Sequence, residues 1–312
     1  MSAVEIQNVT KTFGTTVAVS ELSLLVPKGS VYGFIGPNGS GKSTTIRMIM
    51  RIIHPDDGTI RVLGEDATTS GSANDRIGYL PEERGLYRKM VIGEILEFFA
   101  GLKGVFNCRD EIRGWLKRLG LADYEKKKVE TLSKGMAQKV QFIATVLHRP
   151  ELIILDEPFS GLDPVNMEVL KDAILDMKRQ GATILFSTHD MDVAEKMCDY
   201  IFMIYKGRKV LDGTLDVIQD EYGSDTLRVR TSGNGVIFSQ LPGVERVNDF
   251  GRFQELRMKR GTDPQAILQK LASQTRVEHF EVARPSLHDI FVRIAGPAAQ
   301  VEAHEGSTKP HA

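Results

Sequence analysis

Residues 36–43 constrain the fold of this chain more than any other segment. They read Gly-Pro-Asn-Gly-Ser-Gly-Lys-Ser and fit the pattern G-x-x-x-x-G-K-[ST]. The apolar residues 30–35 before them predict a buried strand, and residues 43–53 predict a helix that ends before Pro55. Between a strand and a helix, such glycines let N–H groups surround phosphate oxygens at a positively polarised helix N-terminus. The residues expected to bind phosphates are Gly36, Pro37, Asn38, Gly39, Ser40, Gly41, Lys42, Ser43 and Thr44.

Two carboxylates follow a second apolar run, residues 152–155. In a parallel sheet, Asp156 and Glu157 would lie at the carboxyl end of that strand, beside the phosphate loop. Asp156 and Ser43 are suited to hold Mg²⁺, and Lys42 would reach the β- and γ-phosphates. Glu157 is the candidate general base that polarises the attacking water. These residues predict a site that binds a nucleotide with Mg²⁺ and hydrolyses it.

Strands and helices alternate along most of the chain. Residues 152–156 and 181–187 are apolar runs separated by a helical pattern, which favours a parallel sheet covered on both faces. Residues 91–120 carry two amphipathic helical patterns and indicate a helical insert. Near residue 223 the pattern changes to alternating strands around a helix, with Asp263 as its N-cap. We therefore expect a domain boundary there.

Composition fits a chain of about two domains. The 312 residues exceed the roughly 250 at which a single hydrophobic core stops growing. The 40 Lys+Arg balance 41 Asp+Glu, and the basic clusters at 126–128 and 206–209 lack interleaved aromatic residues, so no nucleic-acid partner is expected. The apolar runs are shorter than the ~18 residues of a membrane span, and the N-terminus carries no apolar signal. With only two cysteines, a cytoplasmic location is expected.

Further motifs occur in the order found in one known family. The sequence Leu-Ser-Lys-Gly-Met at residues 132–136 resembles the LSGGQ signature of the nucleotide-binding subunits of ABC transporters. Four other segments match that family in order: Phe13 at the adenine-stacking position, Leu80-Pro81-Glu82 at the Q-loop, residues 160–163 at the D-loop and residues 187–190 at the switch. The resemblance covers about residues 4–213.

The resemblance implies a P-loop NTPase fold of the α/β class. This fold has a mainly parallel sheet core, an antiparallel β-subdomain and a helical signature subdomain, here followed by a small C-terminal α+β domain. The expected ATP-binding domain spans residues 1–222, with its helical subdomain at about 88–150. The accessory domain would span residues 223–295, and residues 296–312 would form a disordered tail.

The resemblance also implies a function. Such a subunit pairs head-to-tail with a second copy or a related subunit, with ATP between the phosphate loop of one and Ser133 and Gly135 of the other. His189 would hold the γ-phosphate and the attacking water, and Asp163 would communicate across the pair. The pair would drive a separate integral membrane permease from the inner face of the cell membrane. Residues 80–87, 132–136 and 284–291 resemble the branch of bacterial exporters related to sodium and drug efflux systems.

Two departures from the family pattern alter the charge of the expected site. Glu82 stands where the family has a glutamine, and it is a candidate Mg²⁺ ligand whose carboxylate adds negative charge near the γ-phosphate. Lys134 and Met136 replace a glycine and a glutamine in the signature. Lys134 either compensates for the added charge at the partner's ATP or faces solvent.

The alternative is a soluble ATPase of the same superfamily that acts on ribosomes or nucleic acid. Such proteins usually carry two nucleotide domains in one chain or a long coiled coil. This chain has one phosphate loop and a short helical insert, which disfavours the alternative.

Overall fold

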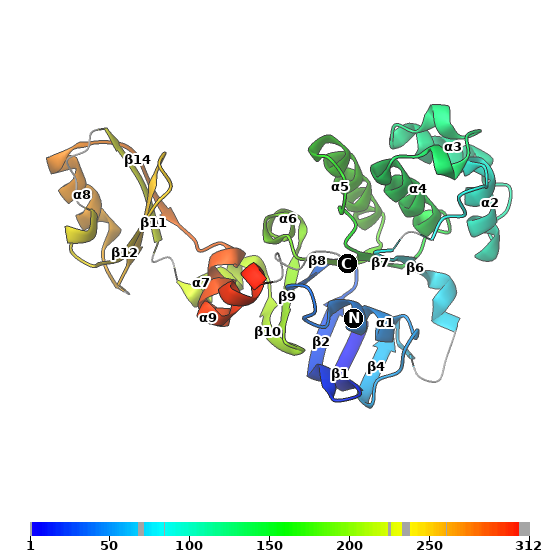
Figure 1. Cartoon of the computed structure of the whole chain (residues 1–312), viewed down its shortest axis with the longest axis horizontal. Coiled ribbons are helices and arrows are strands. Elements are labelled where there is room, and N and C mark those ends of the chain that lie inside the picture. Colours follow the sequence, from blue (N-terminus) through cyan, green and yellow to red (C-terminus); the bar gives the residue numbers. More distant parts are fainter. Residues whose placement is uncertain are drawn as a thin grey trace. The chain divides into compact units, whose positions relative to one another are not determined.

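The structure, a computed structural model, describes residues 2–67, 72–83, 85–223, 226–232, 238–259 and 261–305. Its contacts divide the chain into two units, Met1–Thr214 and Leu215–Ala312 (Figure 1). We call them the first and the second unit. In the described residues, no helix is both long and apolar enough to cross a membrane.

The first unit is built around a six-stranded sheet with the order β10-β9-β3-β8-β7-β6. Its strands are β3 (Val31–Ile35), β6 (Ile77–Leu80), β7 (Leu152–Asp156), β8 (Thr183–Thr188), β9 (Tyr200–Tyr205) and β10 (Arg208–Gly213). All neighbours pair in parallel except β10, which pairs antiparallel with β9. Every residue of β3, β7 and β8 is buried, as expected for strands covered on both faces.

An antiparallel sheet and the helix α1 cover one face of this parallel sheet. The antiparallel sheet has the order β2-β1-β4-β5 and consists of β1 (Ser2–Phe13), β2 (Thr16–Pro27), β4 (Asp57–Val62) and β5 (Glu65–Asp66). Tyr32, Phe34 and Phe202 of the parallel sheet share a buried cluster with apolar residues of these strands and of α1. The antiparallel β-subdomain that the sequence predicts is therefore confirmed.

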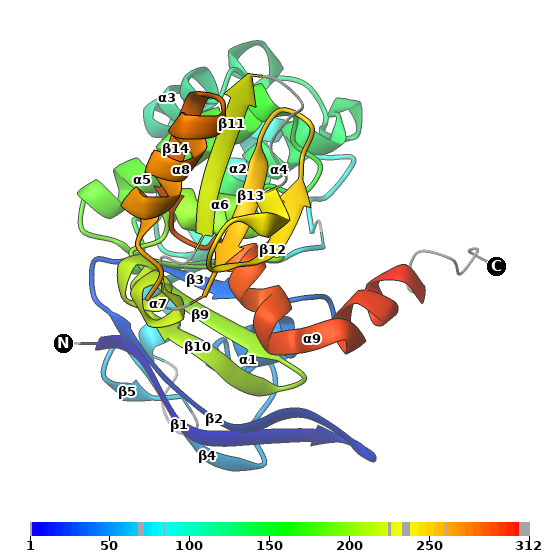
Figure 2. The same cartoon turned by 90° about the vertical axis from the view of Figure 1, so that its left-hand side faces the viewer.

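Helices cover the other face of the parallel sheet. They are α2 (Ile92–Leu102), α3 (Arg109–Arg118), α4 (Lys134–Val146), α5 (Pro164–Arg179) and α6 (Met191–Met197). Val31, Ile153 and Phe186 pack in one cluster with residues of these helices. Figure 2 shows the first unit with these helices and the antiparallel sheet on opposite sides of β3. The P-loop NTPase fold with a helical insert is thus confirmed.

Helix α1 (Lys42–Ile49) is shorter than the sequence predicts. The apolar pattern continues to Ile53, but Arg51 has a left-handed φ of 60°. The N–H groups of Arg51 and Ile52 donate to the carbonyl oxygens of Met48 (3.0 Å) and Arg47 (2.9 Å), which forms a Schellman turn. Glycine usually occupies the left-handed position of this turn, so an arginine there does not predict the end of the helix.

The second unit has its own four-stranded antiparallel sheet and core. The sheet order is β12-β13-β11-β14, with β11 (Thr226–Ser232), β12 (Val244–Asp249), β13 (Gln254–Met258) and β14 (Arg276–Ala283). Helix α8 (Pro264–Gln274) packs Ile267 and Leu271 against Leu227 and Leu256. As predicted, Asp263 caps α8 by accepting a hydrogen bond from Gln265 N (2.9 Å).

The division between the units falls before α7 (Leu215–Tyr222), which the sequence analysis assigned to the ATP-binding domain. The side chain of Gln219 in α7 donates to Pro285 O (3.0 Å), and Arg293 of α9 (Leu287–Glu305) donates to Tyr222 O (3.1 Å). These contacts explain why α7 belongs to the second unit. The tail expected from Gly296 is helical up to Glu305, with an interruption at Gly296, and residues 306–312 lie outside the described residues.

Candidate functional site

The phosphate loop connects the C-terminal end of β3 to α1 and is held tightly by neighbouring backbone. A Cβ atom on Gly36 would lie 2.3 Å from the carbonyl oxygen of Ile204 in β9. At Gly41, which has φ 109°, a Cβ atom would lie 2.6 Å from the carbonyl oxygen of Ala18 in β2. Only glycine fits either position, so the loop follows a path that side chains would block.

Lys42 is buried within the loop that it follows, with 6% of its surface exposed. Its Nζ donates hydrogen bonds to the carbonyl oxygens of Gly36 (2.7 Å) and Pro37 (3.1 Å). Burial lowers the pKa of Lys42, and the negative charges of Glu157, Asp156 and Glu82 act in the opposite direction. The same three carboxylates that the sequence predicts for the site therefore lie close enough to act on the Lys42 ammonium group.

The loop contains a buried polar atom that supports binding of a phosphate. Among the described residues, the hydroxyl of Ser40 has no hydrogen-bond partner, although Ser40 is buried. The N–H groups of the first turn of α1, including those of Ser43 and Thr44, have no acceptors within the helix. Free donors together with the Lys42 cation form a set suited to the oxygens of a phosphate.

Asp156, Glu157 and His189 are linked by hydrogen bonds at the ends of β7 and β8. The hydroxyl of Ser187 donates to Asp156 Oδ1, and it accepts a hydrogen bond from Glu157 N at 3.3 Å. His189 Nδ1 lies 2.8 Å from Glu157 Oε1. Because a carboxylate can only accept, Nδ1 carries the hydrogen, and Nε2 is the nitrogen that remains for another partner. The structure thus joins the expected base to the expected switch histidine.

The backbone of Glu157 has a left-handed φ of 49°, which is uncommon for a residue with a side chain. Its N–H also donates to the carbonyl oxygen of Ser187 at 3.2 Å, so β8 holds this conformation. Strained backbone that neighbouring structure maintains is typical of functional sites. Ser187 therefore contacts the carboxylate of Asp156 and holds the backbone of Glu157, two contacts that the residue pattern alone does not predict.

The residues expected to hold Mg²⁺ lie in a region of concentrated negative charge. Burial and then the Asp156 charge raise the pKa of Tyr79 to about 12, and Glu82 contributes in the same direction. Asp156 is buried, whereas Glu82 is exposed. Among the described residues, no group of three or more Asp, Glu, His or Cys side chains could hold a metal by itself. A magnesium ion bound by Ser43 and carboxylates would need phosphate oxygens as further ligands, as is usual for Mg²⁺.

Phe13 ends β1 with 50% of its surface exposed, as a stacking residue requires. The Nζ atom of Lys11 lies 5.5 Å from the centre of its ring. An exposed aromatic ring flanked by a cation can stack on an adenine base, because every nucleobase presents a flat π-face.

Replacing Phe13 by alanine tests this contact. Base stacking contributes about 1–3 kcal/mol, so we expect Phe13→Ala to weaken ATP affinity by roughly 10-fold while kcat at saturating ATP stays the same. Fluorescent-nucleotide titration would measure the affinity. Phe250→Ala, at an exposed phenylalanine of the second unit, is the matched control. Equal affinities in the two variants would contradict a stacking role.

The remaining predicted residues form a second cluster. Ser133 caps α4 by accepting a hydrogen bond from Met136 N (3.3 Å). Asp163 caps α5 by accepting one from Asn166 N (3.0 Å). A Cβ atom on Gly135 would lie 3.1 Å from the Leu162 side chain, so the signature segment packs against the D-loop segment. In this cluster Lys134 is exposed.

The predicted site residues therefore fall into two sets within one chain. One set surrounds the phosphate loop and contains Lys42, Asp156, Glu157 and His189. The other contains Ser133, Gly135 and Asp163. Among the described residues, no hydrogen bond or ion pair joins a member of the second set to Lys42 or His189.

Comparisons with known proteins agree with this geometry. Residues 19–160 match the ABC transporter family, and residues 213–295 match the family "ATP-binding protein DrrA1-3-like, C-terminal domain". The chain is 41% identical over 293 residues to "Uncharacterized ABC transporter ATP-binding protein YhaQ" of Bacillus subtilis (strain 168), covering 93% of this chain and 98% of that protein. It is 32% identical over 300 residues to "Nod factor export ATP-binding protein I" of Sinorhizobium fredii (strain NBRC 101917 / NGR234), covering 94% and 86%.

A solved structure described as "Structure of ATP binding subunit of ABC transporter" superposes with a TM-score of 0.66 at 32% identity, covering 71% of this chain and 93% of that chain. The fold, the phosphate loop and the relatives thus point to the same family. The chain belongs to the ATP-binding subunits of ABC transporters, has relatives of the exporter type, and is an ATPase.

Proposed function

We propose that two copies of this chain, or one copy and a related subunit, pair head-to-tail with ATP at their interface and drive a separate membrane permease in export. The subunit would then work at the inner face of the cell membrane. The observation that supports this proposal is the separation of the two residue sets. If each ATP needs both sets, a second chain must supply Ser133 and Gly135.

In the proposed mechanism the protein mainly orients groups and neutralises charge, as phosphoryl transfer requires. The Lys42 ammonium would exchange its bonds to Gly36 O and Pro37 O for phosphate oxygens of ATP. Glu157 would accept hydrogen bonding from the attacking water while Ser187 and His189 hold its orientation. Magnesium held by Ser43, Asp156 and Glu82 would supply further positive charge at the phosphates.

An exposed apolar patch near the Q-loop segment is the surface that we assign to the permease. The aromatic patch consists of Tyr87, Phe98, Leu102 and Phe106, all of them exposed. The rings of Tyr87 and Phe98 lie 6.1 Å apart in an edge-to-face arrangement, and a Cβ atom on Gly101 would lie 3.7 Å from the Phe106 ring. Clustered exposed aromatic residues are typical of protein interfaces.

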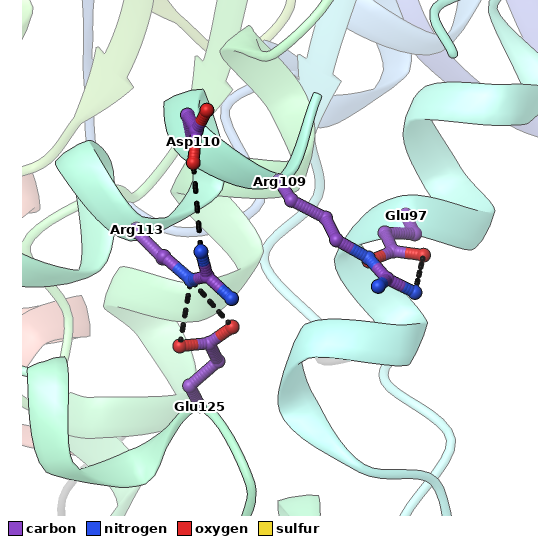
Figure 3. Close-up of polar contacts among 5 residues, drawn as sticks. All are labelled: Glu97, Arg109, Asp110, Arg113 and Glu125. Atoms are coloured by element: carbon purple, nitrogen blue, oxygen red, sulfur yellow. Dashed lines mark hydrogen bonds and ion pairs between the residues drawn. The ribbon is translucent and has the colours of Figure 1, made fainter. Parts of the chain in front are cut away.

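An ion pair joins α2, which carries Phe98 and Leu102 of this patch, to α3. Figure 3 shows Arg109, at the start of α3, paired with Glu97 of α2 (2.6 Å), next in sequence to Phe98. It also shows Arg113 between Asp110 (3.5 Å) and Glu125 (3.2 Å). Exposed pairs of this kind contribute at most about 1 kcal/mol each, so they orient the helices more than they stabilise the unit.

Phe98→Glu tests the permease part of the proposal. The substitution replaces an aromatic ring of the patch by a charged carboxylate. Aromatic residues central to protein interfaces contribute about 2 kcal/mol or more to binding, so we expect at least ~10-fold less subunit bound to membranes. The measurement compares tagged full chains of wild type and variant bound to inner-membrane vesicles from the organism that makes this chain. Its ATPase activity without membranes should stay unchanged.

Leu25→Glu is the matched control, since Leu25 is an exposed leucine on β2. Equal vesicle binding by wild type and Phe98→Glu would rule out the aromatic patch. Absence of binding by wild type would argue against a permease partner and favour a soluble role.

A further inference from the structure

Lys139 is a buried lysine of the signature helix α4 that the site above does not use. Only 5% of its surface is exposed. Its Nζ donates to the carbonyl oxygen of Leu119 (2.6 Å) and to the side-chain oxygen of Asn166 (2.8 Å). Among the described residues, no carboxylate forms an ion pair with Lys139. Burial lowers the pKa of Lys139, and the charge of Asp163 partly opposes this.

Asn166 links Lys139 to Asp163 of the D-loop segment. Its side-chain nitrogen donates to Asp163 Oδ2 at 2.5 Å, and its backbone N–H donates to Asp163 Oδ1 at 3.0 Å. These hydrogen bonds hold the pKa of Asp163 below its usual range. The Asn166 amide therefore accepts from Lys139 with its oxygen and donates to Asp163 with its nitrogen, which fixes its orientation.

Two other residues on the same face of α4 contact the loop from Glu157 to Asp163. Gln138, which is buried, donates from Nε2 to the carbonyl oxygen of Pro158 (3.1 Å). Gly135 packs against Leu162, as its close approach shows. Positions 135, 138 and 139 follow the i, i+3, i+4 spacing of one helix face. The first turns of the signature helix thus contact this loop near its start, at Pro158, and near its end, at Leu162, while Lys139 reaches Asn166 just beyond it.

A buried ammonium group without a carboxylate partner contributes little to stability, because its desolvation offsets the hydrogen bonds that it forms. Within the described part of the chain, the burial of Lys139 is compensated only by the two acceptors that it joins, Leu119 O and Asn166 Oδ1. Lys139 links the signature helix to Asn166, the residue that hydrogen-bonds Asp163, and this link points to a role in positioning.

We propose that Lys139 is a positioning residue that holds the signature serine Ser133 and the D-loop Asp163 as one rigid body. This inference rests on the proposed head-to-tail pair, in which both residues face the partner's ATP. The loop that ends at Asp163 begins at Glu157, the base for the chain's own ATP. Through Lys139 and Asn166, closure on one ATP would therefore orient the base at the other, and the two sites would hydrolyse cooperatively.

The test uses the full chain with Lys139→Met and, separately, Asn166→Leu. We expect ATP binding to single subunits to stay within about twofold, kcat to fall about 10- to 100-fold, and the Hill coefficient for ATP to fall toward one. The double variant should be no worse than either single variant, since both changes break one chain of contacts. Lys139→Arg should recover kcat, because its guanidinium can donate to both acceptors.

Lys171→Met on α5 is the matched control, since Lys171 forms a surface pair with Glu168. If Lys139→Met does not fold, Asn166→Leu decides, because it changes a partly exposed side chain and keeps the backbone bond to Asp163. Unchanged kcat and cooperativity in a folded variant would overturn the role of Lys139. A wild type without an ATP-dependent dimer would instead overturn the proposed pair, and this inference with it.

Discussion

Glu157→Gln is expected to lower ATP turnover by about 10²–10⁴ while ATP binding persists. The amide keeps the size of the side chain but cannot accept a proton from the attacking water. Its oxygen can still accept the hydrogen bond from His189 Nδ1, which is 2.8 Å from the carboxylate in the structure. Because hydrolysis would reopen the proposed pair, the variant should accumulate as a dimer in the presence of ATP and Mg²⁺.

Phosphate release measures the turnover, and light scattering of the full chain measures the dimer. Glu168→Gln, at an exposed position of α5, is the matched control and should behave as wild type. Turnover within a few-fold of wild type would show that Glu157 is not the base. Loss of turnover without an ATP-dependent dimer would agree with Glu157 as the base but argue against the head-to-tail pair.

Lys42→Met should have the largest effect on nucleotide binding. A hydrogen bond to a charged group contributes about 1.5–3 kcal/mol, so losing the ammonium should weaken ATP affinity by roughly 10- to 200-fold. AMP should be affected much less, because it lacks the β- and γ-phosphates. Calorimetric titration with ATP, ADP and AMP would measure this difference.

The matched control is Lys117→Met, at an exposed lysine of α3. An ATP affinity within twofold of wild type would contradict the assignment of the phosphate loop. An equal loss for AMP would instead indicate that the variant disturbs the loop as a whole.

Lys42→Met should also alter how the free energy of unfolding depends on pH. Burial lowers the pKa of Lys42 in the folded protein, so the unfolded chain binds more protons between that lowered pKa and the ordinary value near 10.4. The free energy of unfolding should therefore rise with pH in that window for wild type. Lys42→Met should remove this part of the slope, which urea unfolding at several alkaline pH values would detect.

Local sequence patterns were sufficient for the parts of the site that depend on neighbouring residues. The phosphate loop needs glycines at fixed spacing, so Gly36, Gly41 and Lys42 could be found without a structure. The strand that ends in Asp156 is apolar throughout, because helices and a second sheet cover both of its faces. Such features follow from the spacing of residue types along the chain.

Contacts between distant segments could not be read in this way. Ser187 contacts Asp156 and Glu157 only because β8 pairs with β7 in parallel, with Ser187 opposite Asp156. Lys139 has the residue type of a surface position, yet it is buried and bonded to Leu119 O and to the Asn166 side chain, which are 20 and 27 positions away. α1 ends early at Arg51, which adopts a left-handed conformation that glycine usually occupies. In each case the sequence shows the residue but not its partner.

The order of strands in the central sheet has a consequence for the synthesis of this protein. β3, which leads into the phosphate loop, lies between β8 and β9, which start about 150 and about 170 positions after it. The loop also rests on the carbonyl oxygen of Ile204. A nascent chain on the ribosome therefore cannot complete its nucleotide pocket until nearly the whole first unit has emerged.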